Sequence, residues 1–156
     1  MYNASVLSSR ARYATRALLD LSLREPNKAV LIQDIAERQE IPLKFLQQIL
    51  ATLKVAGLLV SRMGPGGGYS LARPPEEVTL GEVIRATDGM IAPISCVSKN
   101  RYKECGCPNP DTCVLREAFG AVRDAMSDVL DTTTFADLRD RQRVLDSESG
   151  AINYVI

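Results

Sequence analysis

Arg-Met-Gly-Pro-Gly-Gly-Gly-Tyr, residues 62–69, is a glycine-rich turn between two strand candidates, residues 58–63 and 69–73. Glycine permits positive φ angles and a close approach of the backbone to another molecule. A nucleotide-binding loop would need a strand, the pattern GxxxxGK(S/T) and a helix, and that arrangement is missing here. The run therefore predicts a hairpin. Its tip suits the minor groove of DNA, and it also fits a flexible hairpin with no ligand.

Three helices are predicted before this hairpin. Ser8 or Ser9 can cap the first, which should end near Pro26 and has periodic apolar positions at Ala14, Ala17, Leu18 and Leu21. The second has a buried side made of Ile32, Ile35 and Ala36. The third should run from Pro42 to about Gly57. A helix, a tight turn, a second helix and a hairpin form the layout of a winged helix-turn-helix.

The third helix has two different faces. One is an apolar stripe of Leu46, Ile49, Leu50 and Leu53, and the opposite one contains Lys44, Gln47, Gln48 and Ala51. Glutamine can pair with adenine edges, lysine can reach guanine or phosphate, and alanine can accept a thymine methyl group. This face suits a recognition helix in the major groove, although a solvated helix face has the same composition. The candidate DNA-binding residues are Lys44, Gln47, Gln48, Arg62, Gly66 and Gly67.

The second half of the chain predicts a long helix after a cysteine-rich loop. A capping box beginning at Thr79 opens a fourth helix that reaches about Asp88, and residues 89–111 have the composition of a loop. Residues 112–130 should be helical, with a coiled-coil-like seam formed by Leu115, Phe119, Val122, Met126 and Val129. A final helix is expected over residues 135–145, followed by a mobile tail.

The predicted fold is therefore mainly α with a small β-wing: a winged helix-turn-helix plus a long dimerisation helix. Four segments follow from it. These are a DNA-binding domain, a cysteine loop, a dimerisation helix with the C-terminal helix, and a flexible tail, with boundaries at residues 1–88, 89–111, 112–146 and 147–156.

Composition places the chain among ordinary globular proteins, with 156 residues, 46% of them apolar and 24% charged. No apolar stretch approaches the length of a membrane span, and no signal peptide is recognisable, so we expect a cytoplasmic protein that does not bind membranes. The formal net charge is zero, but residues 1–75 carry a balance of +5 and residues 76–156 a balance of −5. Such a division suits one surface that meets a polyanion and another that does not.

All four cysteines lie between Cys96 and Cys113, and the chain has no histidine. In a reducing cytosol, clustered cysteines bind metal or do redox chemistry more often than they form structural disulfides. Their spacing, C-x8-C-x-C-x5-C, lacks the CxxC pairs of zinc sites, whereas soft thiolates also suit iron–sulfur clusters. Cys113 lies at the N-terminus of the predicted helix over residues 112–130, where the helix dipole stabilises thiolate charge.

The whole set of motifs resembles the iron–sulfur regulator family of bacterial winged-helix transcription factors, which includes IscR, NsrR and RirA. The resemblance extends to about residue 145. It rests on the glycine-rich run, the cysteine loop and residues 12–14, 34–38 and 81–84. It implies a homodimer whose long helices cross, and which reads a pseudo-palindromic operator in double-stranded DNA. Gln47 stands where IscR has a glutamate and Met63 where its wing has an arginine, so the known operators of the family do not transfer to this chain.

The resemblance also implies an iron–sulfur cluster, either [2Fe–2S] or [4Fe–4S]. Cys96, Cys107 and Cys113 match the positions of its ligands. The fourth ligand stays open, because Arg116 occupies the position of the IscR histidine and Arg12 that of the NsrR aspartate. Cys105 or an oxygen ligand can complete the set.

These features predict a DNA-binding regulator, in the simplest case a repressor, whose operator affinity is controlled by the cluster. Two alternatives within regulation are a cluster-free thiol switch, with Cys105 and Cys107 or a wider pair as the disulfide, and control by a metabolic enzyme that binds the regulator. An enzyme is the least favoured class, because the Cys105-Gly-Cys107 pair lacks the CxxC context of a thioredoxin-like site.

Overall fold

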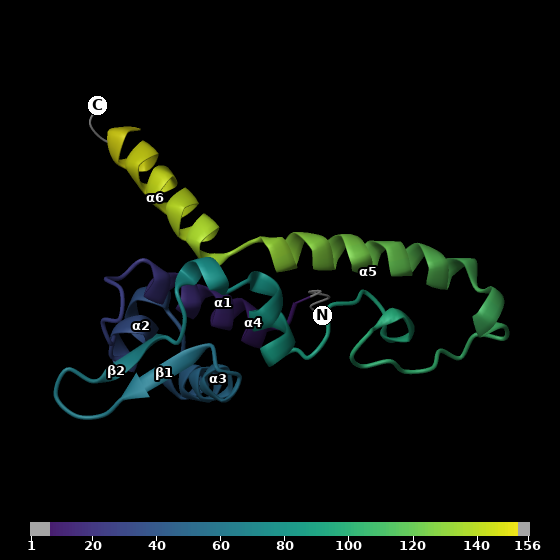
Figure 1. Cartoon of the computed structure of the whole chain (residues 1–156), viewed down its shortest axis with the longest axis horizontal. Coiled ribbons are helices and arrows are strands. Elements are labelled where there is room, and N and C mark those ends of the chain that lie inside the picture. The colour runs from purple at the N-terminus through teal and green to yellow at the C-terminus, as the bar shows by residue number, and fades with distance from the viewer. Residues whose placement is uncertain (1–6, 153–156) are drawn as a thin grey trace.

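The computed structural model describes residues 7–152, and these form six α-helices with one two-stranded sheet (Figure 1). The elements in chain order are α1 (Ser9–Ser22), α2 (Ile32–Gln39), α3 (Leu43–Val55), β1 (Leu59–Arg62), β2 (Gly68–Leu71), α4 (Leu80–Thr87), α5 (Val114–Thr132) and α6 (Phe135–Ile152), with short 3₁₀ helices η1 (Pro75–Glu77), η2 (Ser95–Val97) and η3 (Pro110–Thr112). Helices α1 to α4 and the sheet form a body, from which α5 extends as an arm (Figure 1). The mainly α fold with a small β-wing is confirmed.

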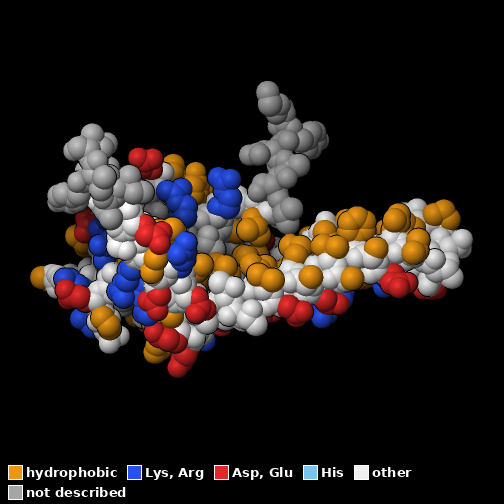
Figure 2. Space-filling view, turned by 90° about the horizontal axis from the view of Figure 1, so that it is seen from above, with side chains coloured by type: hydrophobic (Ala, Val, Ile, Leu, Met, Phe, Trp, Pro, Cys, Tyr) orange, Lys and Arg blue, Asp and Glu red, His pale blue; other side chains and the backbone are white. Residues whose placement is uncertain are grey.

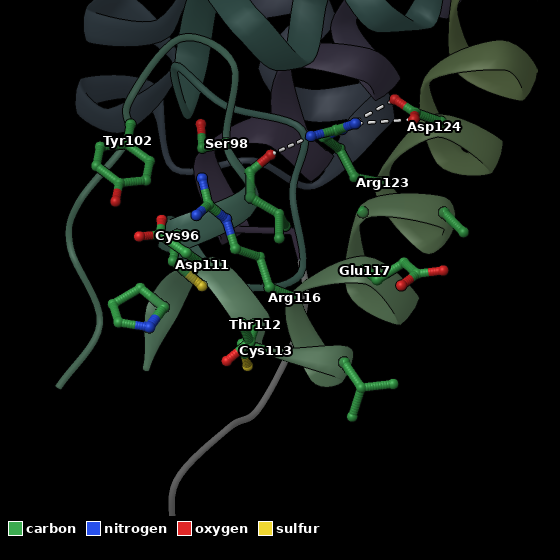
Figure 3. A pocket seen from close by; sticks show the side chains of 15 residues that line it. Cys96, Ser98, Tyr102, Asp111, Thr112, Cys113, Arg116, Glu117, Arg123 and Asp124 are labelled. Atoms are coloured by element: carbon green, nitrogen blue, oxygen red, sulfur yellow. Dashed lines mark hydrogen bonds and ion pairs between the residues drawn. The ribbon is translucent and has the colours of Figure 1, made fainter. Parts of the chain in front are cut away.

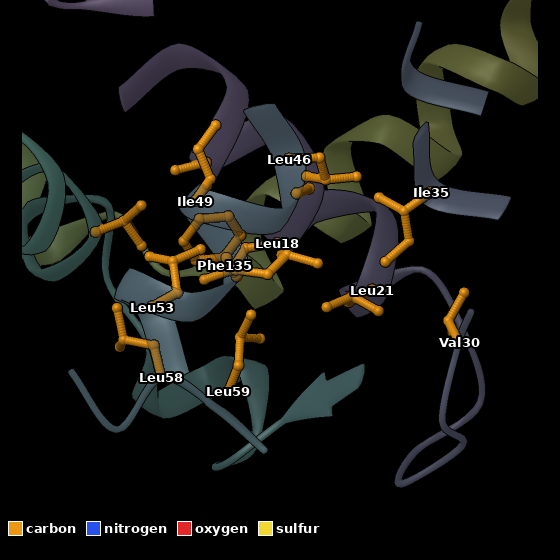
Figure 4. Packing of buried hydrophobic residues seen from close by; sticks show 14 of the residues in the cluster. Leu18, Leu21, Val30, Ile35, Leu46, Ile49, Leu53, Leu58, Leu59 and Phe135 are labelled. Atoms are coloured by element: carbon orange, nitrogen blue, oxygen red, sulfur yellow. The ribbon is translucent and has the colours of Figure 1, made fainter. Parts of the chain in front are cut away.

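One hydrophobic core holds the body together. The predicted stripe of α3 is fully buried, and it packs against Ala14, Ala17 and Leu18 of α1. Phe135, the first residue of α6, inserts among these side chains and is completely buried (Figure 4). Burial of one large apolar side chain contributes about 1.5–3 kcal/mol, so this phenylalanine fixes the chain leaving the arm to the body.

The helix-turn-helix turn depends on a left-handed residue and a buried carboxylate. Glu40, at the end of α2, has a φ of 50° and lets the chain reverse before α3. Asp20 of α1 is 1% exposed and accepts hydrogen bonds from Arg38 at 2.7 and 2.9 Å, from Arg24 at 3.1 Å and from Gln39 at 3.3 Å. Burial opposes the charge, but these donors outweigh it and lower the pKa of Asp20. The carboxylate thus ties α2 to α1.

The hairpin of β1 and β2 is antiparallel, with Leu59 opposite Leu71 and Arg62 opposite Gly68. Tyr69 extends the sheet by exchanging two backbone hydrogen bonds of 2.8 Å with Val30, just before α2. Gly68 has a φ of 137°, and a Cβ atom there would collide with the Val30 carbonyl oxygen. Part of the glycine run is therefore required by the close approach of the wing to α2.

The helix ends differ from the prediction in three places. Helix α1 ends at Ser22, before Pro26, and α5 covers residues 114–132 rather than 112–130. The prediction of a mobile tail from residue 147 is wrong for residues 147–152, because α6 continues to Ile152. No glycine or proline interrupts this helix until Gly150, which is why helical structure can extend beyond Leu145, where the predicted helix ends. Residues 153–156 of the expected tail lie outside the described residues.

The arm has one apolar side. Leu115, Val122 and Val129 are 62%, 46% and 63% exposed, and Phe119 is 37% exposed. In the view of Figure 2, hydrophobic side chains follow one edge of the arm and acidic side chains the other. Among residues 7–152, no helix has the length and hydropathy needed to cross a membrane.

Candidate DNA-binding surface and cysteine site

The polar face of α3 is fully presented to solvent. Lys44, Gln47 and Gln48 are exposed, while the opposite stripe is buried against α1, so the orientation of the helix is fixed by its own core residues. Phe45 adds an edge-to-face contact with Tyr13 of α1, with ring centroids 5.7 Å apart. The predicted reading face therefore stands on a rigid support.

The exposed side chains of the wing tip are those of Arg62, Met63 and Pro65. Arg62 and Met63 are exposed, Met63 by 94%, and Gly66 is exposed with a φ of 71°. Gly67 is buried within the turn, where a Cβ atom would collide with the Arg62 carbonyl oxygen. Gly67 thus shapes the turn, and Gly66 lies at its surface. At the base, Lys54 of α3 donates to Ser61 of β1 at 2.5 Å and holds the wing beside the helix.

The four thiols are brought together in series. Cys96 is buried against Ala92 and Val97, and Cys105 packs on the same small cluster. Cys105 also interacts with Cys107, and Cys107 interacts with Cys113. Cys113 is the N-cap residue of α5, so it lies at the helix N-terminus as expected, although the helix begins two residues later than the predicted start at residue 112. Cys105 is thus a neighbour of both Cys96 and Cys107, and Cys107 is a neighbour of Cys113.

Hydrogen bonding among these thiols separates their acidities. The thiol and backbone of Cys107 donate to Cys105 and lower the pKa of Cys105. The same hydrogen bond, with the negative charge of Cys105, raises the pKa of Cys107 to about 11. Loss of hydration, with the neighbouring Cys105, raises the pKa of Cys96. Cys105 is therefore the thiol of this group that ionises before its two neighbours.

Within residues 7–152 the side chains are not arranged as a metal site, since no three Cys, Asp or Glu side chains there are placed to hold one ion. The donor chemistry nevertheless fits an iron–sulfur cluster: four soft sulfur ligands, linked in series, on one loop without histidine. A cluster would require the loop to draw its sulfur atoms toward a common centre. Proline and glycine at several loop positions are compatible with such a local change.

Beside the thiols lies a cavity of about 730 Å³ between the loop and α5 (Figure 3). Arg116 reaches from α5 across this cavity toward Cys96, and its guanidinium lies 5.7 Å from the centroid of the Tyr102 ring (Figure 3). The sequence identifies Arg116 only as the residue at the position of the IscR histidine. The structure shows that it places a positive charge near the thiols instead.

Arg123 was not predicted as a functional residue, and it is the contact that docks the loop on the arm. Its guanidinium donates to the Val97 carbonyl oxygen at 2.7 Å, one residue after Cys96, and pairs with Asp124 at 2.8 and 2.9 Å. Lys99 of the loop reaches the same carboxylate at 3.2 Å. Together these cations lower the pKa of Asp124 to about 2. Local spacing along the chain could not predict this contact, because it joins residues 26 positions apart.

At its other end the arm is fixed to the DNA-binding body. Arg85 of α4 and Asp131 of α5 form a bidentate ion pair with two contacts of 2.6 Å. A Cβ atom at Gly81 would collide with the Asp131 carboxylate, so a glycine on this face of α4 lets the two helices approach. Thr79 and Thr134 also form a β-bridge just before the buried Phe135. The loop and the reading face are thus connected through one rigid helix.

The comparison with known families decides the class of protein. The model of the Rrf2 family, described as an iron-dependent transcriptional regulator, matches residues 7–141. The chain belongs to the Rrf2 family. Rrf2 proteins are DNA-binding transcription regulators, so the expected class is confirmed and the chain is not an enzyme.

Other relatives agree on this class. This chain is 39% identical over 132 residues to the protein rrf2 of Nitratidesulfovibrio vulgaris, and the match covers 85% of each protein. It is 36% identical over 140 residues to the HTH-type transcriptional regulator IscR of Escherichia coli, covering 90% of this chain and 83% of the relative.

Two solved structures have the same fold. CymR, the global cysteine regulator of B. subtilis, has a TM-score of 0.72 and 29% identity, with coverage of 86% of this chain and 96% of that one. IscR of T. potens has a TM-score of 0.70 and 29% identity, with coverage of 87% of each chain. The Rrf2 fold is therefore shared by CymR, which is named as a cysteine regulator, and by IscR.

Proposed function

We propose that this chain is a dimeric transcriptional repressor whose affinity for a pseudo-palindromic operator is controlled by an iron–sulfur cluster on the cysteine loop. The observation that carries the proposal is the position of the thiols. They lie at the start of a helical arm whose other end is fixed in the winged-helix body, through Arg85, Asp131 and Phe135. A change in the loop therefore has a continuous path to the DNA-reading elements.

In this proposal the segments have separate roles. Residues 1–88 bind DNA, residues 89–111 with Cys113 hold the cluster, and residues 112–146 join two copies. Lys44, Gln47 and Gln48 enter the major groove from α3, while Arg62 and Gly66 place the wing on the backbone and minor groove. Two such surfaces in a twofold dimer fit two half-sites of a palindrome.

The cluster ligands in this proposal are Cys96, Cys107 and Cys113, and Cys105 is the fourth sulfur available in the chain. When bound, an iron–sulfur cluster supplies a group whose charge and ligation respond to redox state and to iron supply. The chain itself supplies the anchoring thiols, the cation of Arg116 beside them and the hydrogen bond from Arg123 that holds the loop on the arm.

The apolar side of α5 is the proposed dimer interface. Four of its five seam residues are exposed in the single chain, while Met126 is half-buried beside α4 and the loop. Exposed apolar side chains of this type are stabilised by burial against a second copy. The acidic opposite face stays in solvent. The interface residues in this proposal are Leu115, Phe119, Val122, Met126 and Val129.

Anaerobic reconstitution with iron and sulfide tests the cluster. We expect visible absorption and stoichiometric iron in the wild type, loss of both in Cys96→Ala, Cys107→Ala and Cys113→Ala, and a weakened or unstable cluster in Cys105→Ala. Operator binding is then measured with and without the cluster, using DNA selected from a random library. A wild type that binds no iron, or a Cys107→Ala variant with a full cluster, would contradict the ligand assignment.

One observation favours a second candidate, a thiol switch. Cys105 contacts both Cys96 and Cys107, and its lowered pKa makes it the readier nucleophile. Oxidation by hydrogen peroxide would join two of these sulfur atoms with loss of two protons and two electrons, while the peroxide is reduced to two waters. Iron-free protein that forms this disulfide, and changes its operator affinity when it does, would support the switch. Mass spectrometry identifies the paired cysteines.

A further inference from the structure

A second cavity, of about 450 Å³, lies between the root of the wing and α6. Its walls come from the end of α1, the segment of residues 24–28, the last residues of β2, the segment of residues 72–76 and α6. None of these elements belongs to the cysteine loop, which lies at the far end of the arm (Figure 1). The cavity is therefore separate from the site described above, and its volume is that of a small-molecule pocket.

Cations outnumber carboxylates among the side chains that line this cavity, although Arg24, Arg73 and Arg139 also pair with Asp20, Glu82 and Asp140, which do not line it. Five cationic side chains line it, and only the carboxylates of Glu25 and Glu76 line it with them; the cations are Arg24, Lys28, Arg73, Arg139 and Arg143. Like charges gathered around one hollow repel one another, and an anion in the hollow relieves that repulsion.

Two of these arginines are arranged to act together. Arg139 and Arg143 are one helical turn apart, so they lie on the same face of α6 and both reach the cavity. The Arg139 side chain is only 18% exposed, and it pairs with Asp140 at 2.8 Å and with Glu76 at 3.4 Å. Guanidinium groups bind carboxylate and phosphate oxygens in a bidentate manner.

Two of the cations have only weak acidic partners. They are Lys28, in the segment of residues 24–28, and Arg143, in α6. Lys28 is 3.4 Å from Glu25, and Arg143 is 3.8 Å from Asp140, distances at which the ion pair is weak and solvated. Arg73, by contrast, is held by Glu82 at 2.7 Å. Lys28 and Arg143 thus keep most of their donors available for a ligand.

We propose that this cavity binds a small polyanion, a molecule with at least two carboxylate or phosphate groups. Arg143 binds one anionic group from α6, with the neighbouring Arg139 adding positive charge, and Lys28 binds a second from the segment before α2. The site does not depend on the cluster or on the cysteines, and it would give this regulator a small-molecule input at the root of its wing.

Isothermal titration of the full-length protein at about 0.15 M salt tests the site, with inorganic pyrophosphate and citrate as probes. We expect saturable binding of at least one probe by the wild type. Removal of one charge-assisted contact should weaken binding about tenfold or more in Arg143→Gln and in Lys28→Gln. Arg141→Gln is the matched control, because Arg141 is exposed on the same helix and does not line the cavity. Its affinity should stay within about twofold of the wild type.

Three results would overturn the proposal. The first is that neither probe binds the wild type at millimolar concentration. The second is that Arg141→Gln loses as much affinity as Arg143→Gln, which would show unspecific attraction of anions. The third is that no probe binds while Arg143→Gln and Lys28→Gln weaken DNA binding and flatten its salt dependence. The cations would then belong to the DNA-contacting surface. Cluster content is unaffected in all of these variants if the two sites are separate, so failure here leaves the cluster proposal intact.

Discussion

Individual residues of α3 divide cleanly between support and recognition. Leu46, Ile49 and Leu53 are completely buried, while Lys44 and Gln47 are exposed on the opposite side. Because the buried residues determine how the helix is rotated, substitutions on the exposed side should change DNA binding without changing stability. The effect of each exposed residue then depends on what it contacts.

Gln47 and Lys44 should therefore fail in different ways. Gln47→Ala together with Gln48→Ala removes contacts to base edges and should reduce discrimination between operator and mismatched DNA by about 1–3 kcal/mol per bidentate contact. Lys44→Ala should weaken binding to all sequences alike and lower the salt slope by about one. Fluorescence anisotropy at several salt concentrations measures both effects. Unaltered operator binding in the double glutamine variant would remove α3 from the reading role.

Asp20 is a residue whose charge the fold requires. Its pKa is lowered in the folded state, so its contribution to stability is present above the unfolded pKa of about 3.9 and is lost as the pH falls through the folded value. Asp20→Asn should lower the free energy of unfolding at pH 7 by about 1–3 kcal/mol, since charged hydrogen bonds from Arg38 are lost.

The same variant should also have a flatter stability profile below about pH 4 than the wild type. Urea unfolding at pH 7 and at several acid pH values measures this. Glu148→Gln, at an exposed position of α6, is the control. If it destabilises the protein as much as Asp20→Asn, the buried network is not the cause.

At the scale of elements, the sequence predicted what local periodicity encodes. The two faces of α3, the capping box at Thr79 and the apolar side of α5 all follow from spacing along the chain, and the structure has the corresponding helices. Contacts between distant segments could not be predicted, because Arg123 with Val97 and Arg85 with Asp131 depend on tertiary packing. The serial contact of the four thiols is of the same kind.

Helix α5 should be the element that makes the dimer. Phe119→Asp with Met126→Asp places two charges in the apolar seam, whose large side chains are each worth about 1.5–3 kcal/mol when buried, and should give monomers. Glu117→Gln with Asp128→Asn alters the charge of the opposite face and should leave the dimer intact. Sedimentation velocity distinguishes the two species. A dimer that survives the seam variant places the interface elsewhere.

For the whole molecule, the arm joins the cysteine loop to the DNA-binding body, which the loop also meets where it leaves α4, since Ile91 and Ser95 share a cavity wall with Ser8 and Ile84. The loop is docked by Arg123 at one end, and the body is joined by Arg85 and Asp131 at the other. Because α5 is one continuous helix, a displacement at either end moves the other. Regulation by the loop then requires these joints to be intact even though none of them touches DNA or a cysteine sulfur.

The ratio of operator dissociation constants with and without the cluster measures this coupling. Typical allosteric coupling of 1–3 kcal/mol corresponds to a ratio of about 5–150. Arg123→Gln and Arg85→Gln should each bring the ratio closer to one while cluster content and dimerisation stay unchanged, because each loosens one joint of the arm. Arg141→Gln removes an exposed charge from α6 and should keep the wild-type ratio. If both joint variants retain the full ratio, the signal does not travel through the arm, and direct contact of the loop with DNA or with the partner subunit becomes the better explanation.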